Sequence, residues 1–152
     1  MNKQENWKMP LPEDITIRVF DGEMLIFSSA GKWLMPIFEL EQFMETYTGP
    51  RTCLSAHDTA IGKAAAVMMI RLGISRMYAN LTSDVALTYI ARLNTVNNEL
   101  NKNSHIQLLY DRKVPKLLCA TEDMLAPLSD TDAMYLLLRQ KAPRQFCQMN
   151  AN

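Results

Sequence analysis

The sequence predicts one α/β domain, a three-layer sandwich in which helices flank a mixed β-sheet. The chain has 152 residues, 48% of them hydrophobic, which suffices for one domain with its own core. Near the N-terminus, two extended runs joined by an Asp-Gly step are typical of an antiparallel hairpin. Strand-like and helical patterns then alternate, as in parallel strands joined by crossover helices. We place the domain at residues 13–142, between a flexible N-terminal arm at 1–12 and a C-terminal tail at 143–152.

The hairpin and a first helix open the domain. Apolar residues alternate with polar ones over residues 15–19, and Asp21-Gly22 separates this run from a second one at residues 24–27. Pro36 suits the first turn of a helix, where its missing N–H removes no hydrogen bond. Because apolar residues then recur at helical spacing, we expect an amphipathic helix over residues 36–47.

A buried helix is expected in the middle of the chain, after a short strand at residues 52–55. We expect it to begin at Asp58 and to stop at Gly73, a residue type that favours helix ends. The alanine run and the lack of a continuous polar face after Lys63 indicate that this helix is covered on most sides.

The alternation continues in the second half of the chain. A strand is expected at residues 74–79, and Ser83 can cap a further helix, whose end within residues 94–103 stays open. Two more strands are expected at residues 105–110 and 114–119, either as a tight hairpin or as a bulged pair about a polar turn.

An irregular segment and a last helix complete the domain. Residues 121–129 show no periodic pattern and are expected to be irregular. Asp130 or Thr131 can cap a helix that runs through Arg139, and we expect Pro143 to end it.

Composition disfavours several classes of function. Sixteen basic residues balance sixteen acidic ones, so no net charge is available to hold a nucleic acid or an anionic membrane surface. The apolar stretches are too short to cross a bilayer, and residues 1–12 lack the apolar core of an export signal. The 3 cysteines are far apart in such a chain, which indicates reduced thiols and a cytoplasmic location.

The start of the buried helix, Asp58 to Lys63, is the candidate site. Asp58 or Ser55 can accept hydrogen bonds from free N–H groups there, and Gly62 leaves room for a ligand or another backbone. An ammonium gains nothing from the positive end of a helix, so Lys63 serves a carboxylate, binds an anionic ligand or reaches solvent. Two interpretations stay open: a capped and packed helix start, or an anion site.

Metal and acid chemistry have weaker support. Zinc needs three or four converging ligands, usually with a close cysteine pair, and Cys53, His57 and Cys119 supply no such pair. We therefore expect no metal and no cofactor. Glu122 and Asp123 could act as paired carboxylates in a closed pocket, but adjacent acids in a polar loop are expected to face water. No catalytic residue is assigned.

Residues 57–66, with the sequence HDTAIGKAAA, carry a resemblance to a known family. Together with the hairpin and the later Leu81-Thr82-Ser83 turn, this stretch resembles the family called domain of unknown function 1893, over about residues 15–139. The resemblance implies a cytidine-deaminase-like fold, in which the Asp-x-x-x-Gly-Lys-Ala motif stands where deaminases begin their catalytic helix. It leaves Asp58, Lys63 and Asp123 as candidate ligand contacts.

The sequence departs from a working zinc deaminase. Such an enzyme has Glu two residues after its first ligand and Pro-Cys-x-x-Cys at the next helix start. Here Thr59 follows His57 at that distance, and Leu81-Thr82-Ser83-Asp84 stands near the second helix start. A cysteine that relatives often carry in the loop matching residues 123–127 is also missing here. A zinc-dependent deaminase is therefore not expected.

Three hypotheses follow for function. The first is a domain without zinc that binds a small anionic or nucleotide-like ligand through Asp58, Gly62, Lys63 and Asp123. The alternative is a non-catalytic interaction or oligomerisation scaffold, such as a homodimer, and the third is a metal-free enzyme. The expected partners include neither nucleic acid nor membrane.

Overall fold

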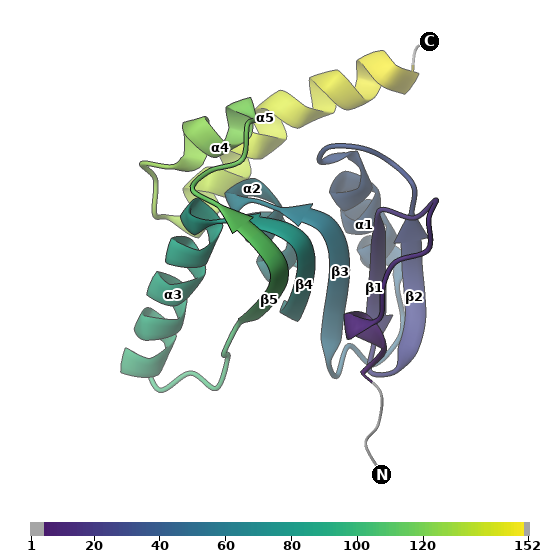
Figure 1. The fold of residues 1–152 in the computed structure, drawn as a ribbon, viewed down its shortest axis with the longest axis horizontal. Coiled ribbons are helices and arrows are strands. Elements are labelled where there is room, and N and C mark those ends of the chain that lie inside the picture. Colours follow the sequence, from purple (N-terminus) through teal and green to yellow (C-terminus); the bar gives the residue numbers. More distant parts are fainter. Residues whose placement is uncertain (1–4, 151–152) are drawn as a thin grey trace.

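The computed structural model describes residues 5–150, with side chains described through residue 140 (Figure 1). The chain opens with the predicted hairpin, in which β1 (Ile17–Asp21) pairs antiparallel with β2 (Met24–Ser29). Gly22 lies in the turn with φ of 61°, the left-handed region that glycine adopts at little cost. The hairpin prediction is confirmed.

Three further strands extend this hairpin into a mixed sheet. β3 (Leu54–Ile61) pairs antiparallel with β1 and parallel with β4 (Ile74–Ser83), which pairs parallel with β5 (Gln107–Val114). The order across the sheet is β2-β1-β3-β4-β5, so a mixed sheet of 5 strands is present, as the α/β prediction required.

The two strands predicted at residues 105–110 and 114–119 are wrong. One strand, β5, runs through the polar residues 111–113 that were expected to turn. β5 lies at the edge of the sheet, so its charged side chains reach solvent without leaving the strand.

Five α-helices and one 3₁₀ helix accompany the sheet in the described chain. They are η1 (Asn6–Lys8), α1 (Met35–Thr46), α2 (Lys63–Arg71), α3 (Asp84–Glu99), α4 (Ala120–Leu125) and α5 (Thr131–Asn150). Ser83 caps α3 as predicted, with its hydroxyl accepting a hydrogen bond from the Ala86 N–H. The segment expected to be irregular contains α4, and α5 continues past Pro143, where we expected it to end.

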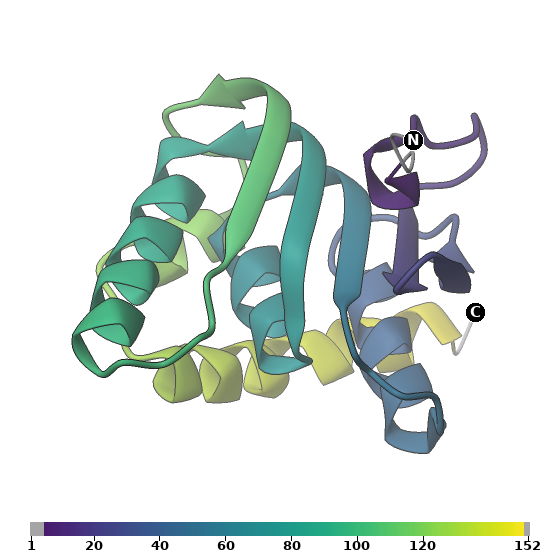
Figure 2. The ribbon, with the colours of Figure 1, turned by 90° about the horizontal axis from the view of Figure 1, so that it is seen from below.

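The helices gather on one face of the sheet rather than on both (Figures 1 and 2). The crossovers from β3 to β4 and from β4 to β5 step in the same direction across the sheet. Because such crossovers are almost always right-handed, α2 and α3 must lie on the same side. The prediction of a three-layer sandwich is therefore wrong in its layering. On the other face, which we call the open face, η1 contacts β1, β3 and β4.

The centre of the core is α2, as predicted. Every residue from Ala64 to Met69 is buried, and Ile70 is half-buried. Gly73, with φ of 92°, follows the helix end. The helix nevertheless begins at Lys63 and not at Asp58, because β3 continues through Ile61. β1 pairs with β3 as far as Asp58, and β4 pairs with it through Ile61, so the ladder with β4 holds residues 58–61 extended.

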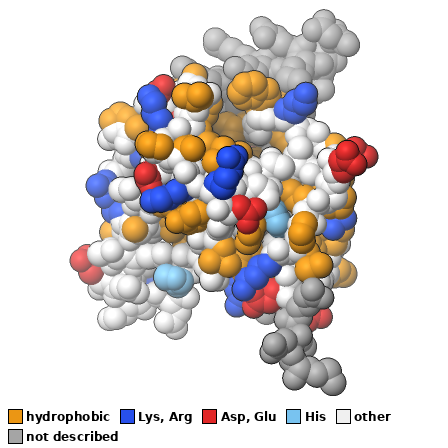
Figure 3. Space-filling view, in the orientation of Figure 1, with side chains coloured by type: hydrophobic (Ala, Val, Ile, Leu, Met, Phe, Trp, Pro, Cys, Tyr) orange, Lys and Arg blue, Asp and Glu red, His pale blue; other side chains and the backbone are white. Residues whose placement is uncertain are grey.

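Surface features are consistent with the composition. Within residues 5–150 no helix is both long and apolar enough to cross a bilayer. Figure 3 shows the open face, where basic and acidic side chains are interspersed with hydrophobic ones and do not form one large patch of a single sign.

Candidate functional site

The start of α2 is closed by a carboxylate from α4. The side chain of Glu122 is only 1% exposed. Its Oε1 accepts a hydrogen bond of 2.8 Å from the Lys63 N–H, and its Oε2 accepts one of 2.9 Å from the Leu117 N–H. Glu122 thus fills the position at which an anionic ligand would bind a helix start. The expectation that Glu122 faces water is wrong.

Gly62 permits this close approach. A Cβ atom at residue 62 would lie 2.7 Å from Leu117 Cδ1 and 3.2 Å from Glu122 Oε1. The space that the sequence predicted at Gly62 is present, but side chains of the protein occupy it in place of an open ligand cavity.

Lys63 binds carbonyl groups of the protein. Its side chain is 5% exposed, and its Nζ donates hydrogen bonds to the carbonyl oxygens of Leu125, at 2.8 Å, and of Leu128. Burial lowers the pKa of this ammonium, the charge of Arg92 lowers it further, and Glu122 raises it. Of the roles considered for Lys63, reaching solvent is wrong, because the ammonium ties α4 and the turn after it to α2.

Asp58 and Asp123 lie elsewhere. Asp58 is a buried strand residue whose Oδ1 accepts only long contacts, 3.4 Å each, from the Ala60 N–H and the Thr59 hydroxyl. Burial raises the pKa of Asp58 to about 7. Asp123 is exposed and forms an ion pair of 2.7 Å with Lys116. Neither residue lines the pocket described below.

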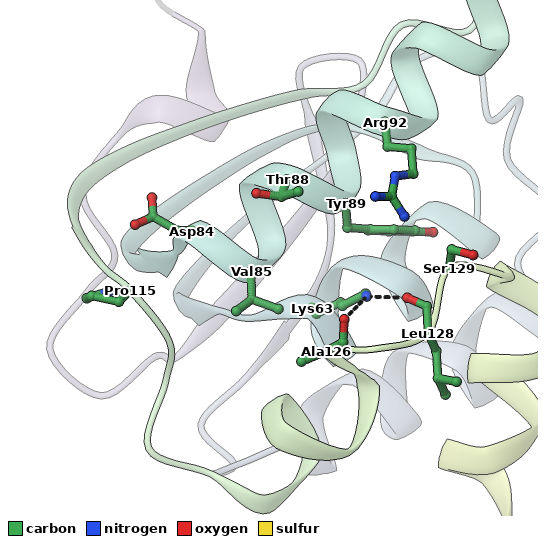
Figure 4. Close-up of a pocket in the computed structure, with 10 residues that line it drawn as sticks. All are labelled: Lys63, Asp84, Val85, Thr88, Tyr89, Arg92, Pro115, Ala126, Leu128 and Ser129. Carbon is green, nitrogen blue, oxygen red and sulfur yellow. Dashed lines mark hydrogen bonds between the residues drawn. The ribbon is translucent and has the colours of Figure 1, made fainter.

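A pocket of about 290 Å³ lies beside Lys63, between α3 and the segment that joins α4 to α5 (Figure 4). Its walls are Lys63, Asp84, Val85, Thr88, Tyr89, Arg92, Pro115, Ala126, Leu128 and Ser129. Lys63, Asp84 and Pro115 follow the last residues of β3, β4 and β5 at once or after one residue. The pocket therefore lies at the carboxyl ends of three parallel strands, where α/β sheets usually bind ligands.

The two ends of the pocket differ in charge. At one end, Asp84 forms an ion pair of 3.0 Å with Lys113. At the other, Arg92 lies near Tyr89 and Ser129 (Figure 4). Among the described residues Arg92 has no hydrogen bond and no ion pair, and its positive charge lowers the pKa of Lys63. This end carries two cations, and within the described part of the chain Lys63 alone is held by protein groups.

The remaining polar groups at the Arg92 end are neutral. Thr88 and Ser129 are exposed hydroxyl residues on the pocket wall. The Tyr89 hydroxyl is 2.7 Å from the Thr131 hydroxyl, and burial raises the pKa of Tyr89, so its ring stays uncharged at neutral pH. This arrangement can hold an anion at Arg92 and a flat or apolar group against the ring.

The residues tested for zinc do not converge. Cys53 precedes β3 and His57 lies within it, and four residues of extended chain span about 13 Å. The described part of the chain contains no group of 3 metal-ligating side chains. The absence of zinc remains a prediction for elemental analysis.

The matching family model is that of the domain of unknown function DUF1893, named TM1506, and it covers residues 11–142. The chain belongs to this family. The crystal structure of the DUF1893 family protein TM1506 from Thermotoga maritima, at 2.70 Å resolution, matches with a TM-score of 0.64 and 22% identity. The match covers 85% of this chain and 82% of that one, and at this identity it shows the shared fold. No curated protein matches.

Sequence reasoning missed Glu122 as the cap of α2 and Arg92 as part of a pocket. One signal for Glu122 was present, because an Ile-Gly-Lys start offers no side-chain cap of its own. Nothing in the sequence said which distant acid would supply it. Arg92 lacked even that signal, since an isolated arginine on a helix usually faces water.

Proposed function

We propose that this DUF1893 domain binds a small anionic, nucleotide-like ligand in the pocket between α3 and the α4–α5 connection. We place it on a cytidine-deaminase-like scaffold that does not use zinc. The mixed sheet, opened by an antiparallel hairpin and extended by two parallel crossovers, supports that scaffold. The position of the pocket at the carboxyl ends of β3, β4 and β5 supports ligand binding.

The observation that carries the proposal is the unpaired guanidinium of Arg92. It lies near a buried ammonium, that of Lys63, whose pKa it depresses, so the pair repel one another. A phosphate or carboxylate placed between Arg92 and the pocket wall relieves this repulsion and gains hydrogen bonds to a charged donor. Among the described residues no protein carboxylate pairs with Arg92.

The other walls suit the rest of such a ligand. Tyr89 offers a ring, and Val85, Pro115 and Leu128 are apolar. Thr88 and Ser129 bring hydroxyl groups that can bind a sugar or a phosphate. Pockets with apolar walls and a few polar groups are typical of small-molecule sites.

Thermal unfolding with added ligands tests the proposal. The probes are inorganic phosphate, pyrophosphate, AMP and adenosine, and AMP or pyrophosphate should raise the melting temperature as its concentration rises. Arg92→Ala should lower the affinity for that ligand about tenfold or more, which is the effect expected from the loss of one charge-assisted hydrogen bond.

Arg76→Ala is the matched control, because Arg76 is also an exposed arginine but does not line the pocket. Its charge lowers the pKa of Glu5, the residue before η1. It should leave binding unchanged. If Arg92→Ala binds as well as the wild-type protein, or if no probe binds, the proposal is wrong. In the second case a dimer in analytical ultracentrifugation would favour the scaffold hypothesis.

A further inference from the structure

The N-terminal segment that precedes the family domain is docked on the open face. The family model begins at residue 11, yet Trp7 is only 4% exposed. The Asn6 side chain donates a 2.9 Å hydrogen bond to the Glu23 carbonyl, and η1 contacts three strands. The predicted flexible arm, residues 1–12, thus contains an anchored segment, which we call the strap and define as residues 5–9. Residues 1–4 lie outside the described chain.

The strap is fastened to the side chain of His57 on β3. His57 is fully buried, and its Nδ1 lies 3.0 Å from the carbonyl oxygen of Trp7. Because a carbonyl oxygen only accepts, Nδ1 must carry the hydrogen and donate it. In the neutral ring Nε2 then bears a lone pair, and this buried atom has no hydrogen-bond partner in the described structure. The Trp7 Nε1–H of the strap also has no partner among the described residues.

From this geometry we infer that the strap is a pH-responsive cover, which protonation of His57 releases from the open face. A second proton would have to enter at Nε2, which has no hydrogen-bond partner in the described part of the chain. A buried charged donor without an acceptor is costly, so the protonated ring favours the state in which water reaches it. Reaching that state requires the strap to lift.

The charges around His57 decide the direction of the effect. The groups that face it or the strap are Arg18 on β1, Arg76 and Tyr78 on β4, Asp111 on β5, and Glu5 and Lys8 beside Trp7. The backbone of Trp7 favours protonation of His57, as do Asp111 and, more weakly, the backbone of Met9. Asp111 already accepts hydrogen bonds from Tyr78 and Asn80. Burial is the largest effect and lowers the pKa of His57 below its ordinary 6.5.

The sign of the pH dependence follows. In the closed state the pKa of His57 is below 6.5, and in the open, hydrated state it returns towards that value. Closure is therefore complete above about pH 6.5 and weakens as the pH falls below it. Because one proton is taken up, the ratio of closed to open molecules falls by at most about tenfold per pH unit.

Tryptophan fluorescence measures this opening in the full chain. The protein has 2 tryptophans. Trp33 is 81% exposed, so Trp33→Phe leaves Trp7 as the reporter without disturbing the core. Its emission should be that of a buried indole at pH 8 and should shift to the red between pH 6.5 and 5. Far-UV circular dichroism should stay constant over the same range.

His57→Gln, in the same Trp33→Phe background, is the control. Glutamine can still donate to the Trp7 carbonyl but cannot titrate in this range, so the red shift should disappear. A red shift that persists in this variant would assign the titration to another group and overturn the inference. So would emission that stays constant to pH 5, or a shift that coincides with loss of circular dichroism.

Proton NMR of the histidine rings keeps the test decisive if His57→Gln fails to fold. The Trp7 indole resonance and the His57 ring should titrate with one midpoint, below pH 6.5. Separate midpoints for the two groups would overturn the inference.

Discussion

The start of α2 and the pocket beside α3 are neighbours at the carboxyl ends of the parallel strands, but they differ in how their charged groups are paired. At the helix start, the Glu122 carboxylate accepts two short bonds and the Lys63 ammonium donates to carbonyl oxygens. In the pocket, Arg92 has no such partner among the described residues. The start of a helix can bind a ligand only if no side chain of the protein already occupies it. Here Glu122 occupies the start of α2, and the cation without a partner among the described residues is Arg92 on α3.

Removal of Glu122 should have the largest effect, because it opens the closed region. Glu122→Ala leaves the N–H groups of Lys63 and Leu117 without an acceptor, and should lower the free energy of unfolding by roughly 3–5 kcal/mol. Urea unfolding measures the loss. Asp123→Asn, on the next residue, should change stability little, because Asp123 is exposed. Equal effects of the two substitutions would contradict the assignment of Glu122 as the cap.

Asp58 is a second buried carboxylate, and it sharpens the comparison because it lacks the short bonds of Glu122. The folded protein holds a proton there up to a pKa of about 7, whereas the unfolded chain releases it near 3.8. Stability from this group is therefore complete below about pH 4 and is lost as the pH rises to about 7.

Asp58→Asn removes this titration. At pH 8 the variant should be more stable than the wild-type protein by roughly 1–3 kcal/mol, and the difference should shrink towards pH 5. Urea unfolding at the two pH values gives the comparison, and the contribution of His57 cancels because both proteins carry it. A difference that does not vary with pH would show that Asp58 keeps its ordinary pKa when folded.

The sequence predicted the elements whose signals are local. The Asp21-Gly22 hairpin and the Ser83 cap depend on adjacent residues, and the burial of α2 follows from its lack of a polar face. The predictions that failed depend on distant partners. Residues 58–61 are extended because β4 pairs with β3 through Ile61. The polar residues 111–113 stay within one strand because β5 lies at the edge of the sheet.

The site was predicted only in part for the same reason. Gly62 and Lys63 were identified from their unusual place at a helix start, and both are involved in a close approach there. Their partners are Glu122 and the carbonyl groups of Leu125 and Leu128, which lie about sixty residues away, where no local pattern marks them. The predicted group of four does not converge, because Asp58 belongs to β3 and Asp123 faces solvent.

Substitution of Arg92 should have the smallest effect on the free energy of unfolding. The sign of that change shows whether Arg92 is free to bind a ligand or stabilises the folded protein. Arg92 is exposed, and its charge depresses the pKa of the buried Lys63. Arg92→Ala removes that repulsion, so the free energy of unfolding should stay constant or rise by about 0.5 kcal/mol at most. Lys63→Ala, the matched loss of a cation from the same pocket, strips donors from buried carbonyl groups and should cost about 1–3 kcal/mol. Urea unfolding without ligand decides between the two cases. If Arg92→Ala destabilises the protein as much as Lys63→Ala does, then Arg92 is a structural residue. Its guanidinium would then already be paired within the folded protein and would not be free to bind an anionic ligand.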